Sequence, residues 1–133
     1  MELKEILIGN KGGDYVSVLP GPLGRESWRN VVIEVRCDVF SGKYRSSFMQ
    51  GELTHLAEGL QELLKSLRGE VEFDAIEGNL KLTFVGDGKG HIAVSGEAVN
   101  RMPGPCLQFE FEIDQTFLPA IISAIFGSER TAQ

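Results

Sequence analysis

Apolar and polar residues alternate over most of this chain, and this alternation predicts a protein built mainly from β-strands. The clearest case is residues 107–113, Leu-Gln-Phe-Glu-Phe-Glu-Ile, where the alternation is uninterrupted. A period of two is typical of a strand with one buried face and one face in water. After residue 116 the apolar positions change to helical spacing, at Phe117, Leu118, Ile121, Ile122 and Ile125. The pattern therefore predicts a strand that passes through polar residues 114–116 into a C-terminal helix.

The N-terminal half carries four more alternating segments. Residues 5–8 and 15–19 flank a glycine-rich loop, as in a β-hairpin. Residues 30–40 and 44–48 flank the short connection 41–43 and form a second expected hairpin. The buried face of the long strand 30–40 is predicted from its apolar parity: Val31, Ile33, Val35, Cys37 and Val39.

A long amphipathic helix separates these strands from a second set. We expect it over residues 52–68, with Gly69 as its C-terminal stop. A leucine stripe at helical spacing indicates the face that packs on a sheet, formed by Leu53, Leu56, Leu60, Leu63, Leu64 and Leu67.

Four strands are predicted in the C-terminal half, over residues 70–74, 79–85, 91–98 and 107–114. Turn sequences rich in glycine separate the first three. The final helix is expected to end near Gly127, followed by a frayed polar tail over residues 128–133.

These elements define the expected fold class. Their order is β4-α-β4-α, and every link between strands is short enough for antiparallel pairing. We predict an α+β protein with about eight strands in one or two curved antiparallel sheets and two helices packed on apolar faces. The strand order cannot be read from the sequence.

Length and composition predict one soluble domain over residues 1–133. The chain has 133 residues, of which 42% are apolar and 24% charged, which is typical of a globular protein with its own core. The first five residues lack the basic and apolar pattern of a signal peptide, and no apolar run is long enough to span a membrane. We therefore expect a cytoplasmic protein that does not bind membranes.

The net charge of −6 narrows the class of partner. Nucleic acid needs stripes of Lys and Arg to neutralise its phosphates, so we do not expect direct binding of nucleic acid. An acidic surface can instead steer a basic protein toward itself. The alternative interpretation is that mild acidity only keeps the protein soluble.

No catalytic, cofactor or metal site is predicted. The two histidines, His55 and His91, have no second ligand near them in the sequence. The Gly-Asp-Gly-Lys-Gly stretch at residues 86–90 leads into a strand and not a helix, so it lacks the helix N-terminus that a phosphate loop uses. Two cysteines, Cys37 and Cys106, are too few for a disulfide framework.

The positions of the predicted strands that face water, opposite the apolar ones, carry seven acidic and three basic residues. The basic ones are Arg36, Arg45 and Lys81, and cross-strand pairing with them is the alternative to a free acidic face. If the strands neighbour one another, their carboxylates form a face that can bind a partner. The residues predicted to bind it are Glu34, Asp38, Glu72, Asp74, Glu110 and Glu112.

The order of segments resembles a known family. Four elements carry the resemblance: residues 40–44, the helix that ends at 63–69, residues 90–94, and the strand with its following helix at 107–118. The most specific of them is the strand that ends in Asp114-Gln115-Thr116 before a hydrophobic helix. Over residues 40–126 the chain is similar to the small bacterial immunity proteins of the WapI type, which protect a cell against the toxic C-terminal domain of a wall-associated polymorphic toxin.

The resemblance implies a protein that is not an enzyme and that neutralises a basic toxin by protein–protein binding. The matching positions are predicted to form the fold, so no toxin-binding residue is implied by them. Two other functions stay open from the residues. One is a small-molecule-binding module whose pocket is lined by Trp28, Phe40, Tyr44 and Phe48, and the other is a homo-oligomer that uses its sheet edges.

Overall fold

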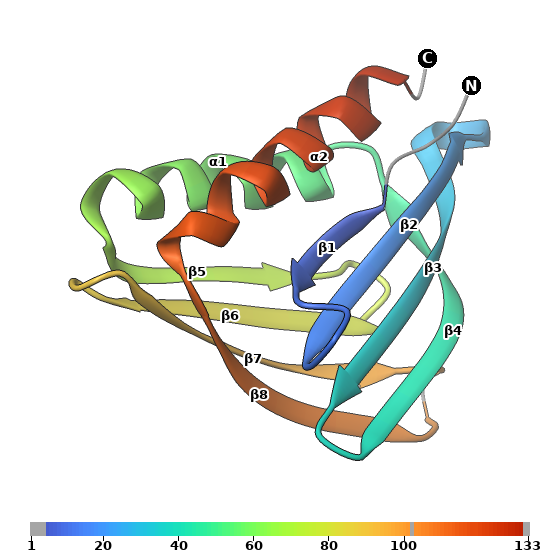
Figure 1. Cartoon of the computed structure of the whole chain (residues 1–133). Helices are drawn as coiled ribbons and strands as arrows, with labels where there is room; N and C mark the ends of the chain where they lie inside the picture. The colour runs from blue at the N-terminus through green and yellow to red at the C-terminus, as the bar shows by residue number, and fades with distance from the viewer. Residues whose placement is uncertain (1–4, 102, 132–133) are drawn as a thin grey trace.

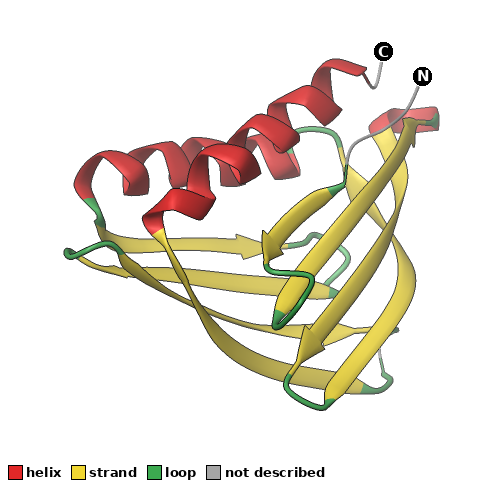
Figure 2. Cartoon of the chain, in the orientation of Figure 1, coloured by secondary structure: helices red, strands yellow, loops and turns green. Residues whose placement is uncertain are grey.

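The fold is described from a computed structural model of the chain, over residues 5–101 and 103–131. Four strands and a helix are followed by four more strands and a second helix, so the predicted β4-α-β4-α order is confirmed. Figure 1 shows the arrangement, and Figure 2 shows how much of it is strand. The first half consists of β1 (Ile6–Gly9), β2 (Tyr15–Leu23), β3 (Trp28–Cys37), β4 (Phe40–Met49) and α1 (Glu52–Ser66). The second half consists of β5 (Arg68–Asp74), β6 (Leu80–Asp87), β7 (His91–Val99), β8 (Cys106–Asp114) and α2 (Leu118–Thr131).

The strands form two antiparallel sheets in sequence order. Sheet A has the order β1-β2-β3-β4, and sheet B has the order β5-β6-β7-β8. Consecutive strands pair because each link is a short hairpin, which needs no crossover. Sequence patterns could not decide between one sheet and two, and the structure shows two.

The helices lie side by side and contact each other (Figure 1). Each helix follows one sheet in the chain but packs beside the first strand of the other sheet. Helix α1 follows sheet A and contacts β5, whereas α2 follows sheet B and contacts β1. The two halves are therefore built alike and interlock through their helices.

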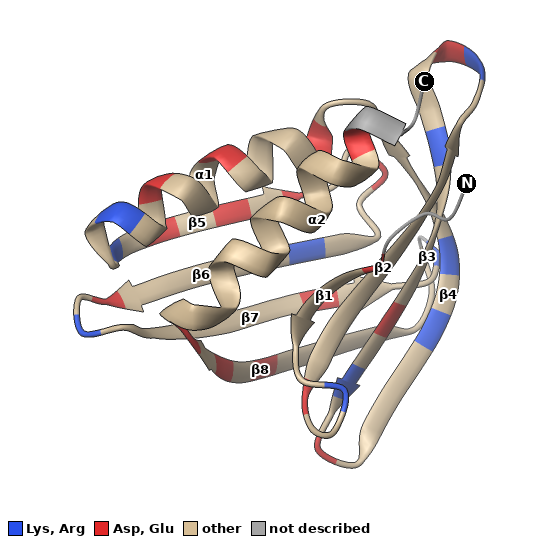
Figure 3. Ribbon diagram, turned by 45° about the horizontal axis from the view of Figure 1, so that its top comes forward, with Lys and Arg blue, Asp and Glu red and all other residues tan. Residues whose placement is uncertain are grey.

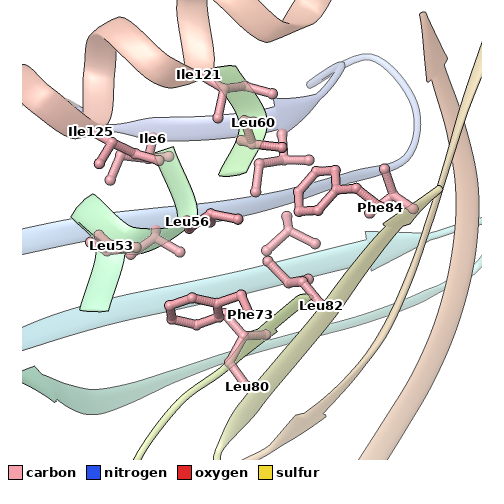
Figure 4. Close-up of a cluster of buried hydrophobic side chains, with 14 of the residues drawn as sticks. Ile6, Leu53, Leu56, Leu60, Phe73, Leu80, Leu82, Phe84, Ile121 and Ile125 are labelled. Carbon is pink, nitrogen blue, oxygen red and sulfur yellow. The ribbon is translucent and has the colours of Figure 1, made fainter. Parts of the chain in front are cut away.

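One cluster of buried side chains joins both sheets and both helices. Figure 4 shows leucines of α1 between isoleucines of α2 and the inner face of β6. Phe48 of sheet A meets Phe73 of sheet B edge to face, with ring centroids 5.4 Å apart. The leucine stripe is thus a core face, as predicted: Leu53, Leu56, Leu60 and Leu63 are buried, and Leu64 packs against the cluster.

Three predicted boundaries are corrected. The β3–β4 turn lies at residues 38–39 and not at 41–43, so Val39 is 81% exposed instead of buried. Asp38 takes a left-handed conformation with φ 57°, which carboxylate-bearing residues tolerate in tight turns. Helix α1 stops at Leu67, which is left-handed with φ 60° and donates its N–H to the Leu63 carbonyl, before Gly69 is reached.

The third correction concerns the C-terminus, where α2 continues past Gly127 to Thr131. Ser128 is buried, and its carbonyl accepts a hydrogen bond from the guanidinium of Arg29, which is 2% exposed. Arg29 also forms an ion pair of 3.2 Å with Glu129. A cation that binds the last carbonyls of a helix stabilises its C-terminal end, so this contact extends the helix into the predicted tail. Residues 132 and 133 of that tail lie outside the described residues.

Candidate functional site

The outer face of sheet B gathers most of the acidic residues of the strands. Residues opposite each other in an antiparallel sheet share a face, and the register aligns Glu72, Thr83, Ser95 and Glu110 in one row across the four strands. The rows beside it start at Glu70 and at Asp74. We call this surface the acidic face. Its eight carboxylates belong to Glu70, Glu72, Asp74, Asp87, Glu97, Glu110, Glu112 and Asp114.

Few cations balance these carboxylates (Figure 3). Lys81 stands between Asp74 and Glu97 in the register, but within the described residues it lies within 4.0 Å of neither carboxylate. The ion pair found on the face joins His91 Nδ1 to Asp87 at 2.9 Å. Glu97 accepts a hydrogen bond from the Gln108 amide at 3.1 Å. The face therefore keeps a large excess of negative charge.

Two of these carboxylates are held in the ionised form by local hydrogen bonds. The backbone N–H of Lys89 and the ring of His91 lower the pKa of Asp87 to about 2. The side chain and backbone N–H of Thr116 lower the pKa of Asp114, which also caps the turn that leads into α2. In return, the Asp87 carboxylate raises the pKa of His91. The end of the face around the β6–β7 turn thus stays charged in mildly acidic solution.

The outer face of sheet A has a different character. Arg36, Lys43 and Arg45 are exposed on it, together with Leu19, which is 42% exposed. Lys11 lies 2.8 Å from the carboxylate of Glu5 and 3.9 Å from that of Glu34. Acidic groups on this face are therefore few and partly neutralised.

The structure divides the predicted binding residues between the two sheets. Glu72 and Asp74 of β5 and Glu110 and Glu112 of β8 lie on the acidic face, at its two opposite edges. Glu34 lies on sheet A beside Lys11, and Asp38 lies in the β3–β4 turn, where its N–H binds the Asp14 carboxylate. These two do not join the other four. Arg36 and Arg45 are also on sheet A, so Lys81 alone of the three basic residues in the alternative interpretation shares the acidic face.

Sequence reasoning missed members of the face that lie at turns or strand starts. Glu70 has the same parity as Glu72 and could have been included on that ground. Asp87 stood in a stretch interpreted as a turn, and Asp114 stood among the polar residues between the last strand and the final helix. Strand ends are the least predictable part of an element, since they depend on the partner strand.

The aromatic residues considered for a ligand pocket do not gather at one place. Phe48 is buried against Phe73, and the Tyr44 hydroxyl donates to the Asn79 carbonyl at 2.6 Å. Phe40 is 64% exposed at the tip of the β3–β4 hairpin. Each of these side chains therefore has its own structural surroundings.

The structure also bears on the cysteines, on metal binding and on membrane crossing. Cys37 is half-buried and Cys106 is exposed, and both are free thiols. Among the residues that the structure describes, no three metal-ligating side chains converge. Within the same residues, neither helix combines the length and the apolar character that crossing a bilayer requires.

Comparison with known proteins defines the class. The family model of the immunity protein WapI-like family matches residues 12–127. The chain therefore belongs to the immunity protein WapI-like family, a match that starts well before the segments in which the resemblance was noticed. No sequence among curated proteins matches the chain significantly.

Two solved structures are similar in backbone shape. One is MRP1/MRP2 of Trypanosoma brucei, with a TM-score of 0.48 and 13% identity over 94% of this chain and 81% of that one. The other is the plant transcriptional regulator PBF-2, with a TM-score of 0.47 and 13% identity over 99% of this chain and 84% of that one. Similarity at this level carries no information on function.

Proposed function

We propose that this protein is a non-enzymatic immunity protein that neutralises a bacterial toxin by binding it, and that the acidic face of sheet B is the contact surface. Membership of the WapI-like family supports a toxin as the partner. The observation that carries the choice of surface is the excess of carboxylates over cations on the outer face of sheet B, which is largest on β5 and β8.

The physical argument is electrostatic. Successive outward side chains of one strand lie about 7 Å apart, so neighbouring carboxylates along β5 and along β8 lie within the screening length of about 8 Å at physiological salt. Their fields therefore add, and they attract a partner with a positive surface before contact is made. Enzymes that act on nucleic acid are basic where they bind phosphate, so a toxin of that type fits this face.

The first experiment is a titration of this protein with the toxin domain encoded beside it, by calorimetry and by a kinetic binding assay at two salt concentrations. We expect tight binding whose association rate falls as salt rises, because screening weakens long-range attraction. Absence of binding to a well-folded toxin domain contradicts the proposal. Binding that does not respond to salt contradicts the choice of the acidic face.

A pair of charge-reversal variants locates the surface. The double substitution Glu110→Lys with Glu112→Lys changes the charge of the face by four and should slow association about tenfold at low salt. The matched control, Glu26→Lys with Glu34→Lys, changes the net charge equally but on the sheet A half. Equal slowing by both pairs would mean that net charge, and not the acidic face, governs association.

A further inference from the structure

Strand β5 is an edge of sheet B, and from Glu70 onward its outward backbone groups are unpaired. In an antiparallel pair, hydrogen-bonded residues alternate with residues that bond away from the partner. Leu67 bonds Gly88 and Ala75 bonds Leu80, on either side of the β5–β6 register. Residues 69, 71 and 73 therefore bond β6, and the N–H and C=O groups of Glu70, Glu72 and Asp74 point away from it. Among the described residues no partner is found for these groups.

A groove runs along this edge, between β5 and α1. It has a volume of about 690 Å³ and is lined by α1 from His55 to Ser66 and by β5 from Arg68 to Glu72. Helix and strand meet closely at Gly59, where an added Cβ would lie 2.8 Å from Val71 Cγ1. The groove therefore has a floor of small and apolar groups, formed by Gly59, Leu63 and Val71, beside a row of free backbone donors and acceptors.

The other sheet edges are shorter or partly occupied. Strand β1 has only four residues, and its groove with α2 is about 340 Å³. On β8 the carbonyl of Glu110 accepts from the Cys37 thiol at 3.4 Å. On β4 residues 41–44 face Ala98, Asn100 and residues 105–107 across a small pocket. Strand β5 thus offers a free edge from Glu70 to Asp74 with an open groove beside it.

The charges along the groove favour a bound segment with basic side chains. Glu58, Glu62, Glu70 and Glu72 line it, against Lys65 and Arg68. The Lys65 ammonium is already paired with Glu62 at 3.5 Å. A strand added to β5 would place alternate side chains directly opposite Glu70, Glu72 and Asp74, where opposite charge is favourable. Its other side chains would enter the groove above Gly59 and Val71, where only small or apolar groups fit.

From this juxtaposition we propose that the β5 edge binds an extended segment of the toxin, which adds to sheet B as a fifth strand. The segment carries Lys or Arg at alternate positions, with small or apolar residues between them. Backbone hydrogen bonds supply affinity in this mode, and the alternate side chains supply specificity. The inference rests on the proposed function and adds the partner's backbone conformation and side-chain pattern.

Amide hydrogen exchange of this protein, alone and with the adjacent toxin domain bound, tests the inference directly. The amides of Glu70, Glu72 and Asp74 should exchange rapidly in the free protein and at least about tenfold more slowly in the complex. The amide of Ser47 is the internal control, because it also points away from its partner strand, β3, but lies on the edge of sheet A, outside the acidic face. If the toxin binds and the three β5 amides stay fast, strand addition is overturned while the immunity function stands. If the toxin does not bind, both are overturned.

A proline series gives a second readout. The substitution Glu72→Pro removes an N–H that β6 does not use, so the fold is expected to tolerate it. It should raise the Kd for the toxin about tenfold, through loss of an intermolecular hydrogen bond and a clash with the added strand. Ser47→Pro removes a similar outward N–H from the edge of sheet A, and Glu72→Gln removes the charge alone. Each of these should change Kd by about threefold or less. Equal effects of all three variants would overturn strand addition, provided that melting curves show all three folded.

Discussion

Sheet A and sheet B have the same strand order, but their outer faces carry opposite charge. Each has four antiparallel strands in sequence order, and each is followed by a helix. Their inner faces meet in one apolar cluster, so both inner faces are constrained in the same way. Their outer faces are free of that constraint: sheet A exposes Arg36, Lys43 and Arg45, whereas sheet B exposes carboxylates. The fold therefore leaves the charge of each outer face free to vary, and the proposed partner contact uses the acidic one.

The largest expected effect concerns the inner faces of the two sheets, which should contribute equally to the free energy of unfolding. Phe48 of sheet A is 1% exposed and Phe84 of sheet B is fully buried. Each substitution, Phe48→Ala and Phe84→Ala, should lower the free energy of unfolding by about 3–5 kcal/mol, through lost burial and a residual cavity. Chemical denaturation measures this. Phe40→Ala is the control, and its exposed ring should matter by less than about 1 kcal/mol. A large inequality between Phe48 and Phe84 would break the equivalence of the two sheets.

The next largest effect on stability concerns the contact between Arg29 of sheet A and the C-terminal end of α2. Arg29 holds the end of α2 through Glu129 and the Ser128 carbonyl. Substitution Arg29→Met keeps much of the side-chain volume but leaves a mostly buried carboxylate without its cation. Because Glu129 is partly exposed, we expect a loss of about 2–3 kcal/mol, below the full cost of an isolated buried charge. Thermal unfolding would measure the loss of stability, and circular dichroism would measure any loss of helix at the C-terminal end of α2. Unchanged stability would mean that the ion pair does not hold α2.

A smaller effect distinguishes the outer faces. Reversing two cations of sheet A, Lys43→Glu with Arg45→Glu, extends negative charge to the other sheet. If only sheet B contacts the toxin, the association rate should rise by no more than about twofold, from the change in net charge. This compares with the roughly tenfold loss expected for Glu110→Lys with Glu112→Lys. A strong gain from the sheet A variant would assign part of the contact to that sheet.

The smallest effect is the pH dependence of the Asp87–His91 pair. The pKa of His91 is raised in the folded state, so its contribution to stability is complete below pH about 6.5 and disappears as pH rises through the folded pKa. The pKa of Asp87 is lowered to about 2, so its contribution is present above pH about 3.9 and is lost as pH falls toward 2. Comparing unfolding of the wild type and His91→Gln between pH 5 and 8 isolates the histidine. A difference that grows with pH would contradict the assigned sign.

The predicted fold class, element order and core stripe were confirmed because they depend on local periodicity. Alternation along 107–113 determines a strand wherever its partner lies, and the leucine spacing of α1 determines a buried face. Errors fell at boundaries. Val39 continued the apolar parity of β3, but a tight turn at Asp38 removed it from the strand. The sequence predicted Ser128 as the start of a polar tail. In the structure it lies in the buried end of α2, where its carbonyl contacts Arg29, 99 residues away in sequence.

The sequence by itself determined which residues point to water on each strand, because side chains alternate by covalent geometry. It also determined that acidic residues outnumber basic ones among them. Only the tertiary structure decided that Glu72 and Glu110 share a sheet while Glu34 belongs to another, since strand pairing depends on contacts distant in sequence. The free edge of β5 and its groove with α1 were decided at the same level. Unpaired backbone groups leave no trace in residue identity, so they become visible only when the neighbours of each strand are known.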